Sequence, residues 1–275
     1  MVNIVFKNYV NFWHVASTAR SKNIDDFLLL NEAYNQNALN DQNTILLKNF
    51  IKCFKNKKGI KSQLYQDVFA SFIIGNKFDK TFLEFGATDG IEFSNSYMLE
   101  NRLGWKGVLS EPSPQWHESL KRNRKNTKII KQCIWSKSKE TLDFFMSDAG
   151  VHSTINDFVD SDKNSMPGNT ALRKRNGKII PVKTIALNDV IEEHFNNITP
   201  SYISIDTEGS EYEILKSLNF ANYRPKVFTI EHNYTDLEIK IDDLMSDNKY
   251  KRVFKNLTDF DAWYVCENTL IELDF

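Results

Sequence analysis

The sequence predicts an α/β protein built on a mostly parallel, doubly wound sheet. From residue 80 onward, short apolar runs alternate with segments of helical periodicity, which is typical of strand–helix–strand crossover units. Several of these runs end in an acidic residue followed by a turn, as strands do at the carboxyl edge of an open sheet. Only 6 Pro and 10 Gly interrupt the 275 residues, so most of the chain is expected in regular structure.

Composition narrows the class of protein. Hydrophobic residues make up 41% of the chain and include 20 Phe, enough to fill a substantial core. A formal charge of -1 gives no general attraction to nucleic acid or to an acidic membrane. Polar residues interrupt the first twenty residues, so no secretory or membrane-spanning segment is expected. Cys53, Cys133 and Cys266 lack metal or redox spacing and are expected to be reduced, buried thiols of a cytoplasmic protein.

The elements follow in order along the chain. Residues 1–60 show helical spacing of apolar side chains and are expected to form an N-terminal helical extension. Residues 61–275 are expected to form the α/β domain, which opens with a helix over Gln63–Ile74. The expected strands are Thr81–Phe85, Gly107–Ser110, Thr127–Ile134, Tyr202–Ile205 and Val227–Ile230. The expected helices are Ser94–Asn101, Pro114–Arg124, Leu187–His194, Glu211–Leu218 and Leu237–Asp247.

Residues 140–184 break this alternation. They contain two further apolar runs separated by a polar stretch around Pro167 and Gly168. We interpret them as an inserted or edge-strand region whose loop can cover a site.

The first candidate site follows the strand at Thr81–Phe85. Glu84 near its end leads into a turn with Gly86 and Gly90, where glycine permits a sharp bend and close approach of a ligand. The spacing is not Gly-x-Gly-x-x-Gly, so a dinucleotide pyrophosphate is disfavoured. An ordinary strand-to-helix connection is the alternative interpretation.

The next strand ends at Glu111. In doubly wound folds, a carboxylate at this point accepts two hydrogen bonds from a ribose diol. The alternative is an acid that stabilises the N-terminus of the helix beginning at Pro114.

Two later strands bring more polar residues to the same edge. Asp206 and Glu208 follow one strand, while Glu211 fits an ordinary helix cap. The last expected strand leads into four polar residues: Glu231, His232, Asn233 and Tyr234.

Five motifs, in this order, resemble the FkbM-type methyltransferases. They are Ser62–Asp67, Phe82–Gly90, Ser94–Tyr97 with Leu99 and Glu100, Gly104–Gly107 through Glu111 and Pro112, and Ile205–Glu211. The match covers about residues 62–234. The resemblance implies a Rossmann-like class I methyltransferase sheet of seven strands, mostly parallel, and S-adenosylmethionine as cofactor.

The resemblance also implies cofactor-binding residues. Glu84 is expected near the methionine ammonium, Glu111 at the ribose, and Cys133 with Ile134 beside the adenine, although these last two fit plain core residues equally well. The remaining expected cofactor-binding residues are Gly86, Ala87, Asp89, Gly90, Asn95, Ser96 and Asp206.

Methyl transfer needs alignment and, for a hydroxyl acceptor, a base. Asp206 and His232 are the expected catalytic residues, together with Glu208. A magnesium ion held by Asp206, Glu231 and His232 is an alternative way to activate the acceptor.

The acceptor is expected to be a sugar hydroxyl, on a nucleotide-linked sugar or a surface (capsular) polysaccharide precursor. Arg173 and Arg175 in the covering loop suit phosphates, and Asn233 with Tyr234 complete the expected substrate contacts. The alternatives are an NAD-dependent oxidoreductase and a non-catalytic S-adenosylmethionine-binding protein. A homodimer is an open alternative to a monomer.

Overall fold

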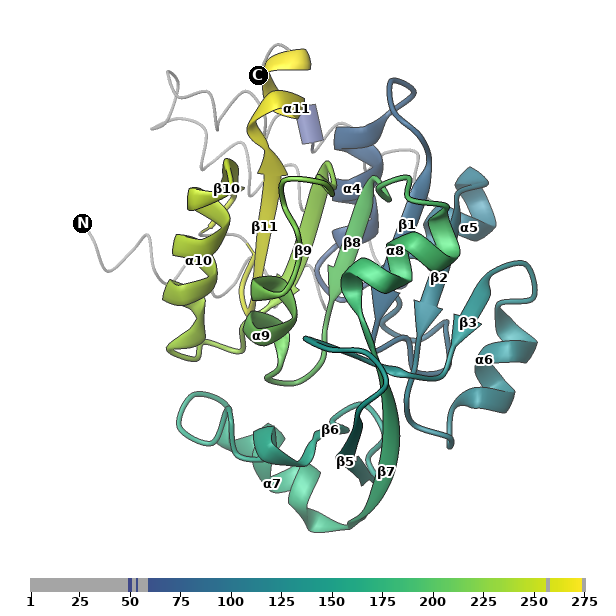
Figure 1. The fold of residues 1–275 in the computed structure, drawn as a ribbon, viewed down its shortest axis with the longest axis vertical. Coiled ribbons are helices and arrows are strands. Elements are labelled where there is room, and N and C mark those ends of the chain that lie inside the picture. The colour runs from purple at the N-terminus through teal and green to yellow at the C-terminus, as the bar shows by residue number, and fades with distance from the viewer. Residues whose placement is uncertain (1–48, 51–52, 54–58, 256–257, 274–275) are drawn as a thin grey trace, which may run out of the picture.

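A computed structural model describes residues 49–50, 53, 59–255 and 258–273 of the chain. The expected helical extension over residues 1–60 therefore lies almost entirely outside the described residues. Figure 1 shows a large twisted sheet flanked by helices, with a smaller sheet below the lower ends of its strands.

The large sheet has seven strands in the order β10-β11-β9-β8-β1-β2-β3. Strand β11 runs in the direction opposite to the other six strands. The predicted mostly parallel, seven-stranded sheet is thus confirmed. Its strands are β1 (Thr81–Phe85), β2 (Lys106–Ser110), β3 (Lys128–Ile130), β8 (Tyr202–Ile205), β9 (Val227–Glu231), β10 (Tyr250–Val253) and β11 (Asp261–Cys266).

The register aligns the carboxyl ends of the four central strands. Glu84 of β1 pairs with Leu109 and Ser204 on its two sides, and Ile205 of β8 pairs with Ile230 of β9. The residues that follow these strands consequently emerge side by side at one edge.

Apolar side chains on alternating strand positions build a core on each face of the large sheet. Phe82 and Tyr202 pack on one face against α4 (Gln66–Ile74) and α5 (Tyr97–Leu103). Leu83 and Ile203 pack on the other face against the helices α8 (Leu187–Phe195), α9 (Glu211–Lys216) and α10 (Leu237–Asp247). Two further α-helices are α6 (His117–Asn123) and α11 (Glu267–Glu272).

One expected strand is divided between the two sheets. The run Thr127–Ile134 was predicted as a single strand, but β3 ends at Ile130 and β4 (Cys133–Trp135) belongs to the small sheet. The Ser110 hydroxyl donates to the carbonyl of Gln132 (2.9 Å), so the link between β3 and β4 is held against the end of β2.

The small sheet is formed largely by the region that breaks the crossover pattern. Its order is β4-β7-β5-β6, with β5 (Thr141–Ser147), β6 (Thr154–Ile155) and β7 (Gly177–Ala186). A 3-10 turn over Asn156–Phe158 and α7 (Pro167–Arg175) complete it. This unit lies across the carboxyl edge of the large sheet (Figure 1).

Within the part of the chain that the structure describes, no helix has the length and apolar character needed to cross a membrane. Cys133 and Cys266 are buried free thiols, and Cys53 is partly buried.

Candidate functional site

A cavity of about 340 Å³ opens at the carboxyl edge, between the large sheet and the small sheet. Residues that follow β1, β2, β8 and β9 form one side, and the loop after β5 forms part of the other side. A volume of this size is within the range of small-molecule sites.

Glu84 and Asn95 form one end of the cavity. Glu84 accepts hydrogen bonds from the Asn95 backbone N–H (2.7 Å) and from the hydroxyls of Ser94 and Ser96. Burial raises the pKa of Glu84, and the nearby Arg124 opposes that rise. The Asn95 amide donates to Ser204 Oγ (2.9 Å), whereas its Oδ1 is buried with no hydrogen-bond partner among the described residues. This oxygen is available to a donor group of a ligand.

The two glycines of the turn after β1 lie so close to other parts of the chain that a side chain would not fit there. Gly86 has φ +70, and a Cβ there would overlap the carbonyl oxygen of Asp206. A Cβ on Gly90 would lie 2.6 Å from side-chain atoms of Leu120 and Arg124. This corrects the interpretation that both glycines make room for a ligand: of the two, only Gly86 lines the cavity.

Three other expected cofactor residues lie beside the cavity and do not line it. Asp89 accepts hydrogen bonds from the backbone N–H groups of Ile91 and Glu92 and so shapes the turn. Ser96 donates to Glu84. Ala87 belongs to the apolar core.

Glu111 lines the cavity where β2 ends. Its two carboxyl oxygens accept the backbone N–H groups of Thr88 and Ser113, each at 2.8 Å. Burial raises the pKa of Glu111 to about 7, although these two hydrogen bonds oppose the rise. Cys133 and Ile134 also line the cavity, from β4 of the small sheet. Burial, reinforced by Glu111, raises the pKa of the Cys133 thiol to about 12, so the thiol stays protonated.

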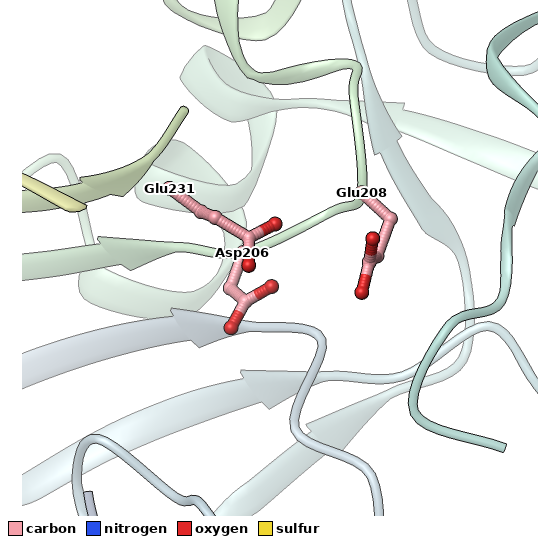
Figure 2. A group of neighbouring side chains, drawn as sticks. All are labelled: Asp206, Glu208 and Glu231. Carbon is pink, nitrogen blue, oxygen red and sulfur yellow. The ribbon is translucent and has the colours of Figure 1, made fainter. Parts of the chain in front are cut away.

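Three acids gather where the neighbouring strands β8 and β9 end. Figure 2 shows Asp206 and Glu231 close together and Glu208 facing them. One carboxyl oxygen from each lies within 4.8 Å of the others. Asp206 lines the cavity and is partly exposed there, yet protein surrounds its carboxyl group.

Asp206 and Glu231 behave as a pair. Burial raises the pKa of both carboxyls well above the ordinary range. The negative charge of Glu208 raises the pKa of Asp206 further, and the negative charge of Asp206 raises that of Glu231 further. Two buried carboxyls this close favour a proton shared between them, because two neighbouring negative charges would repel each other. Glu231 Oε2 is buried without a hydrogen-bond partner among the described residues. The pair therefore holds a shared proton and one acceptor that is open to a ligand.

Glu208 is held by residues of the small-sheet region. It adopts a left-handed backbone conformation with φ 61. Its two carboxyl oxygens contact Arg173 Nη2 (2.6 Å) and His152 Nδ1 (3.1 Å). His152 also lines the cavity. We did not predict His152 from the sequence, because it lies in a loop with no strand-end or motif signal.

Arg173 and Arg175 were expected to contact the substrate, but neither lines the cavity. The Arg173 side chain is fully buried and pairs with Asp162 and Glu208. Arg175 is exposed on α7 and does not line the cavity. Their placement does not fit the expected contacts with substrate phosphates.

His232 lies outside the cavity. Its Nδ1 accepts the Tyr234 N–H (3.1 Å), and its Nε2 lies 3.1 Å from the Asp261 carbonyl oxygen. Burial lowers its pKa to about 4. With both ring nitrogens engaged, its placement does not fit the expected roles of base or metal ligand. Asn233 lines the cavity, whereas Tyr234 is 48% exposed and does not.

The side chains of Asp, Glu, Lys and Arg type that line the cavity are all acidic. Among the described residues, no Lys or Arg lines it, and the acids are Glu84, Glu92, Glu111, Asp206, Glu208 and Glu231.

The fold and the site define a class. A seven-stranded sheet with one antiparallel strand, a glycine turn after β1 and an acid after β2 agree with the Rossmann-like methyltransferase sheet that the resemblance implies. Residues 84–260 match the family model described as the methyltransferase FkbM domain. Because this match spans more than half of the chain, the protein belongs to the FkbM methyltransferase family, and the resemblance predicted from the five motifs is confirmed.

Solved structures give distant likenesses. A putative caffeoyl-CoA O-methyltransferase from Staphylococcus aureus is 13% identical, with 89% of this chain and 100% of that chain covered and a TM-score of 0.42. An O-methyltransferase from Bacillus cereus in complex with SAH is 10% identical, with coverages of 88% and 100% and a TM-score of 0.41. A precorrin-6y C5,15-methyltransferase from Geobacter metallireducens GS-15 is 14% identical, with coverages of 72% and 76% and a TM-score of 0.38. No curated protein matches the chain.

Proposed function

We propose that the protein transfers a methyl group from S-adenosylmethionine to a hydroxyl of an uncharged sugar unit, such as one in a surface (capsular) polysaccharide precursor. The observation that carries this proposal is the division of the cavity. The strand order places Glu84, Asn95 and Glu111 on the side of β1 and β2, and it places a cluster of carboxyls where β8 and β9 end, with no cation among the described lining residues.

The side of β1 and β2 suits the cofactor. The unpartnered Asn95 Oδ1 and the Glu84 carboxyl can accept hydrogen bonds from the ammonium of a methionine moiety. Glu111 is held by two backbone N–H groups and can accept a ribose diol. Cys133 and Ile134 supply an apolar wall for the adenine. When bound, S-adenosylmethionine supplies an activated methyl group.

The cluster of carboxyls suits a neutral polyol. Carboxyl groups accept hydrogen bonds from sugar hydroxyls, whereas they repel phosphates. We therefore prefer the uncharged sugar over the nucleotide-linked sugar, whose diphosphate would need cations that the described lining does not provide.

Asp206 and Glu231 bind the acceptor in this proposal. Glu231 Oε2 is an open acceptor for a hydroxyl, and the shared proton lets the other carboxyl donate. The magnesium site expected at Asp206, Glu231 and His232 stays a prediction for the two acids. Full activity in EDTA would exclude it, and loss of activity restored by magnesium would support it.

Thermal unfolding tests the cofactor. We expect S-adenosylhomocysteine and S-adenosylmethionine to raise the unfolding temperature, because ligands that bind the native state stabilise it. NAD should have no effect. Glu111→Ala should lose the ligand-induced rise, and Glu118→Ala, an exposed acid on α6, should keep it. Stabilisation by NAD alone would instead support the oxidoreductase.

Transfer of labelled methyl groups to methyl glycosides of neutral hexoses tests the acceptor. The same hexoses presented as nucleotide diphosphate sugars form the comparison. Faster transfer to the nucleotide-linked set would contradict the preference for an uncharged acceptor. Stabilisation by S-adenosylmethionine without transfer to either set, or to polysaccharide extracts, would favour a non-catalytic binding protein. Cytoplasmic location and a homodimer stay predictions, and light scattering of the purified chain tests the dimer.

A further inference from the structure

His152 is placed in the cavity wall by a contact between distant segments. It lies in the loop between β5 and β6, and its Nδ1 is 3.1 Å from Glu208 Oε1 in the loop after β8. The ring lines the same cavity as Asp206 and Glu231, while 16% of its side chain remains exposed. Its Nε2 makes no hydrogen bond with any described residue. One ring nitrogen is thus anchored by a carboxyl group, and the other is available to a ligand.

Arg173 fixes both members of this contact. Its Nε donates to the backbone carbonyl of His152 (2.9 Å), and its Nη2 donates to Glu208 Oε2 (2.6 Å). Its Nη1 donates to the Val159 carbonyl (3.0 Å) and to Asp162 Oδ1 (2.9 Å). Asp162 also accepts the Thr170 hydroxyl. A fully buried guanidinium with this many partners holds the loop of His152 and the carboxyl of Glu208 in one geometry.

This geometry selects one imidazole tautomer. A carboxyl oxygen opposite Nδ1 favours the tautomer that carries its proton on Nδ1, which leaves the lone pair on Nε2. A carboxyl group that orients a histidine in this way also stabilises the cation formed when Nε2 takes up a proton.

The other groups of the wall are less suited to that role. Asp206 and Glu231 already share a proton, and His232 lies outside the cavity with both nitrogens engaged. Glu208 has both oxygens occupied by Arg173 and His152.

We infer that His152 is the general base of the reaction and that Glu208 and Arg173 are its positioning residues. The inference rests on the proposed function and adds the group that removes the proton from the acceptor hydroxyl. The acceptor O–H bond breaks as His152 Nε2 takes the proton, and the acceptor oxygen forms its bond to the methyl carbon as the carbon–sulfur bond breaks. The imidazolium is compensated by Glu208. Release of the proton to solvent restores the base.

Charged groups face His152 from several elements. Glu208 faces Nδ1 from the loop after β8, Arg173 from α7 touches its carbonyl, and Asp162 lies behind Arg173. Asp206 and Glu231 line the same cavity and lie next to Glu208.

Nitrogen NMR of the intact protein tests the tautomer without any acceptor. In protein with labelled histidine, the His152 signals are assigned by their loss in His152→Gln. We expect Nδ1 to be protonated and Nε2 unprotonated in the neutral ring. Glu208→Gln should weaken this preference, whereas His194→Gln, a substitution on α8 outside the cavity, should leave it unchanged. A neutral ring that carries its proton on Nε2 would overturn the inference.

Steady-state kinetics with the methyl glycosides test whether His152 acts as the general base. We expect His152→Gln to lower kcat by about 10²- to 10⁴-fold with little change in the acceptor KM. The acid limb of the wild-type pH profile, on which kcat rises with pH, should disappear in the variant. Unchanged kcat with an unchanged pH profile would also overturn the inference. Stabilisation by S-adenosylhomocysteine should persist in His152→Gln; its absence from the wild type would instead contradict the proposed function.

Discussion

Gly86 at the end of β1 lies against the carbonyl oxygen of Asp206 at the end of β8, so closely that a Cβ on Gly86 would overlap that oxygen. The contact joins the turn after β1 directly to the loop after the neighbouring strand β8, which carries Asp206 and Glu208 of the acid cluster. Gly86 also has φ +70, which a residue with a side chain rarely adopts. Position 86 therefore requires glycine for two reasons: its backbone conformation, and the lack of space for a Cβ.

Gly86→Ala should therefore be strongly destabilising. Gly104→Ala is the matched control, because Gly104 also has φ +70 but has nothing within 4 Å of its Cβ position. We expect about 1–2 kcal/mol for Gly104→Ala from conformation alone, and a clearly larger loss for Gly86→Ala. Urea unfolding measures both. Equal losses in the two variants would show that the backbone moves to admit the methyl group.

Arg173→Met should destabilise the fold, because it leaves Asp162 and Glu208 buried without their cation. Removing one partner of a buried ion pair costs about 3–5 kcal/mol. Arg175→Met, two residues further along α7 and exposed, should change the free energy of unfolding by less than about 0.5 kcal/mol. Urea unfolding of the two variants is the measurement. A small effect of Arg173→Met would mean that water or another side chain replaces the guanidinium.

Glu111 should couple cofactor binding to pH. Its pKa is about 7 in the free protein because of burial, and a ribose diol donates best to the ionised form. Binding of S-adenosylhomocysteine should therefore release protons near pH 6.5, and its affinity should rise with pH through 7. Calorimetry in buffers of different ionisation enthalpy counts the protons. Glu111→Gln should release fewer, and equal release from both proteins would exclude Glu111 as the source.

Asp67 should make stability depend on pH. Its Oδ1 accepts the Ser62 hydroxyl (2.6 Å) and the Val68 N–H, its Oδ2 has no partner among the described residues, and burial raises its pKa from 3.8 to about 7. The folded protein thus holds a proton that the unfolded chain releases. The stabilisation by this proton is fully present below about pH 4 and is lost as pH rises through 7.

Asp67→Asn removes this titration. Relative to Asp67→Asn, the wild type should lose stability between pH 4 and 8, as measured by urea unfolding across that range. Asp79→Asn, an exposed acid before β1, should instead keep the wild-type pH dependence. Parallel curves for wild type and Asp67→Asn would show that Asp67 is ionised in the folded state below pH 7.

The placement of the strand-end residues followed from the sequence, because parallel strands deliver their last residues to one edge. Glu84, Glu111 and Asp206 all line the cavity as expected. His232 was expected at the same edge, but β9 ends at Glu231, and the His232 ring turns toward the Tyr234 N–H and the Asp261 carbonyl. Glu231 and Asn233 face the cavity, and His232 between them faces away.

Contacts between segments that are distant along the chain could not be predicted from the sequence. The pairing of His152 with Glu208 joins loops 56 residues apart and depends on how the small sheet folds. Likewise, the apolar run Thr127–Ile134 gave no sign that its two halves belong to different sheets. Strands β10 and β11 lie in the part of the chain that the five motifs do not cover.

Residues 140–184 form one continuous segment that supplies most of the small sheet, here called the cassette. His152, Asp162 and Arg173 all belong to residues 140–184, whereas their partner Glu208 belongs to the large-sheet framework. Exchanging that cassette between relatives to change acceptor preference would transplant the base without its anchor. A functional chimaera would need Glu208 of the framework and Arg173 of the cassette to be kept as a matched pair.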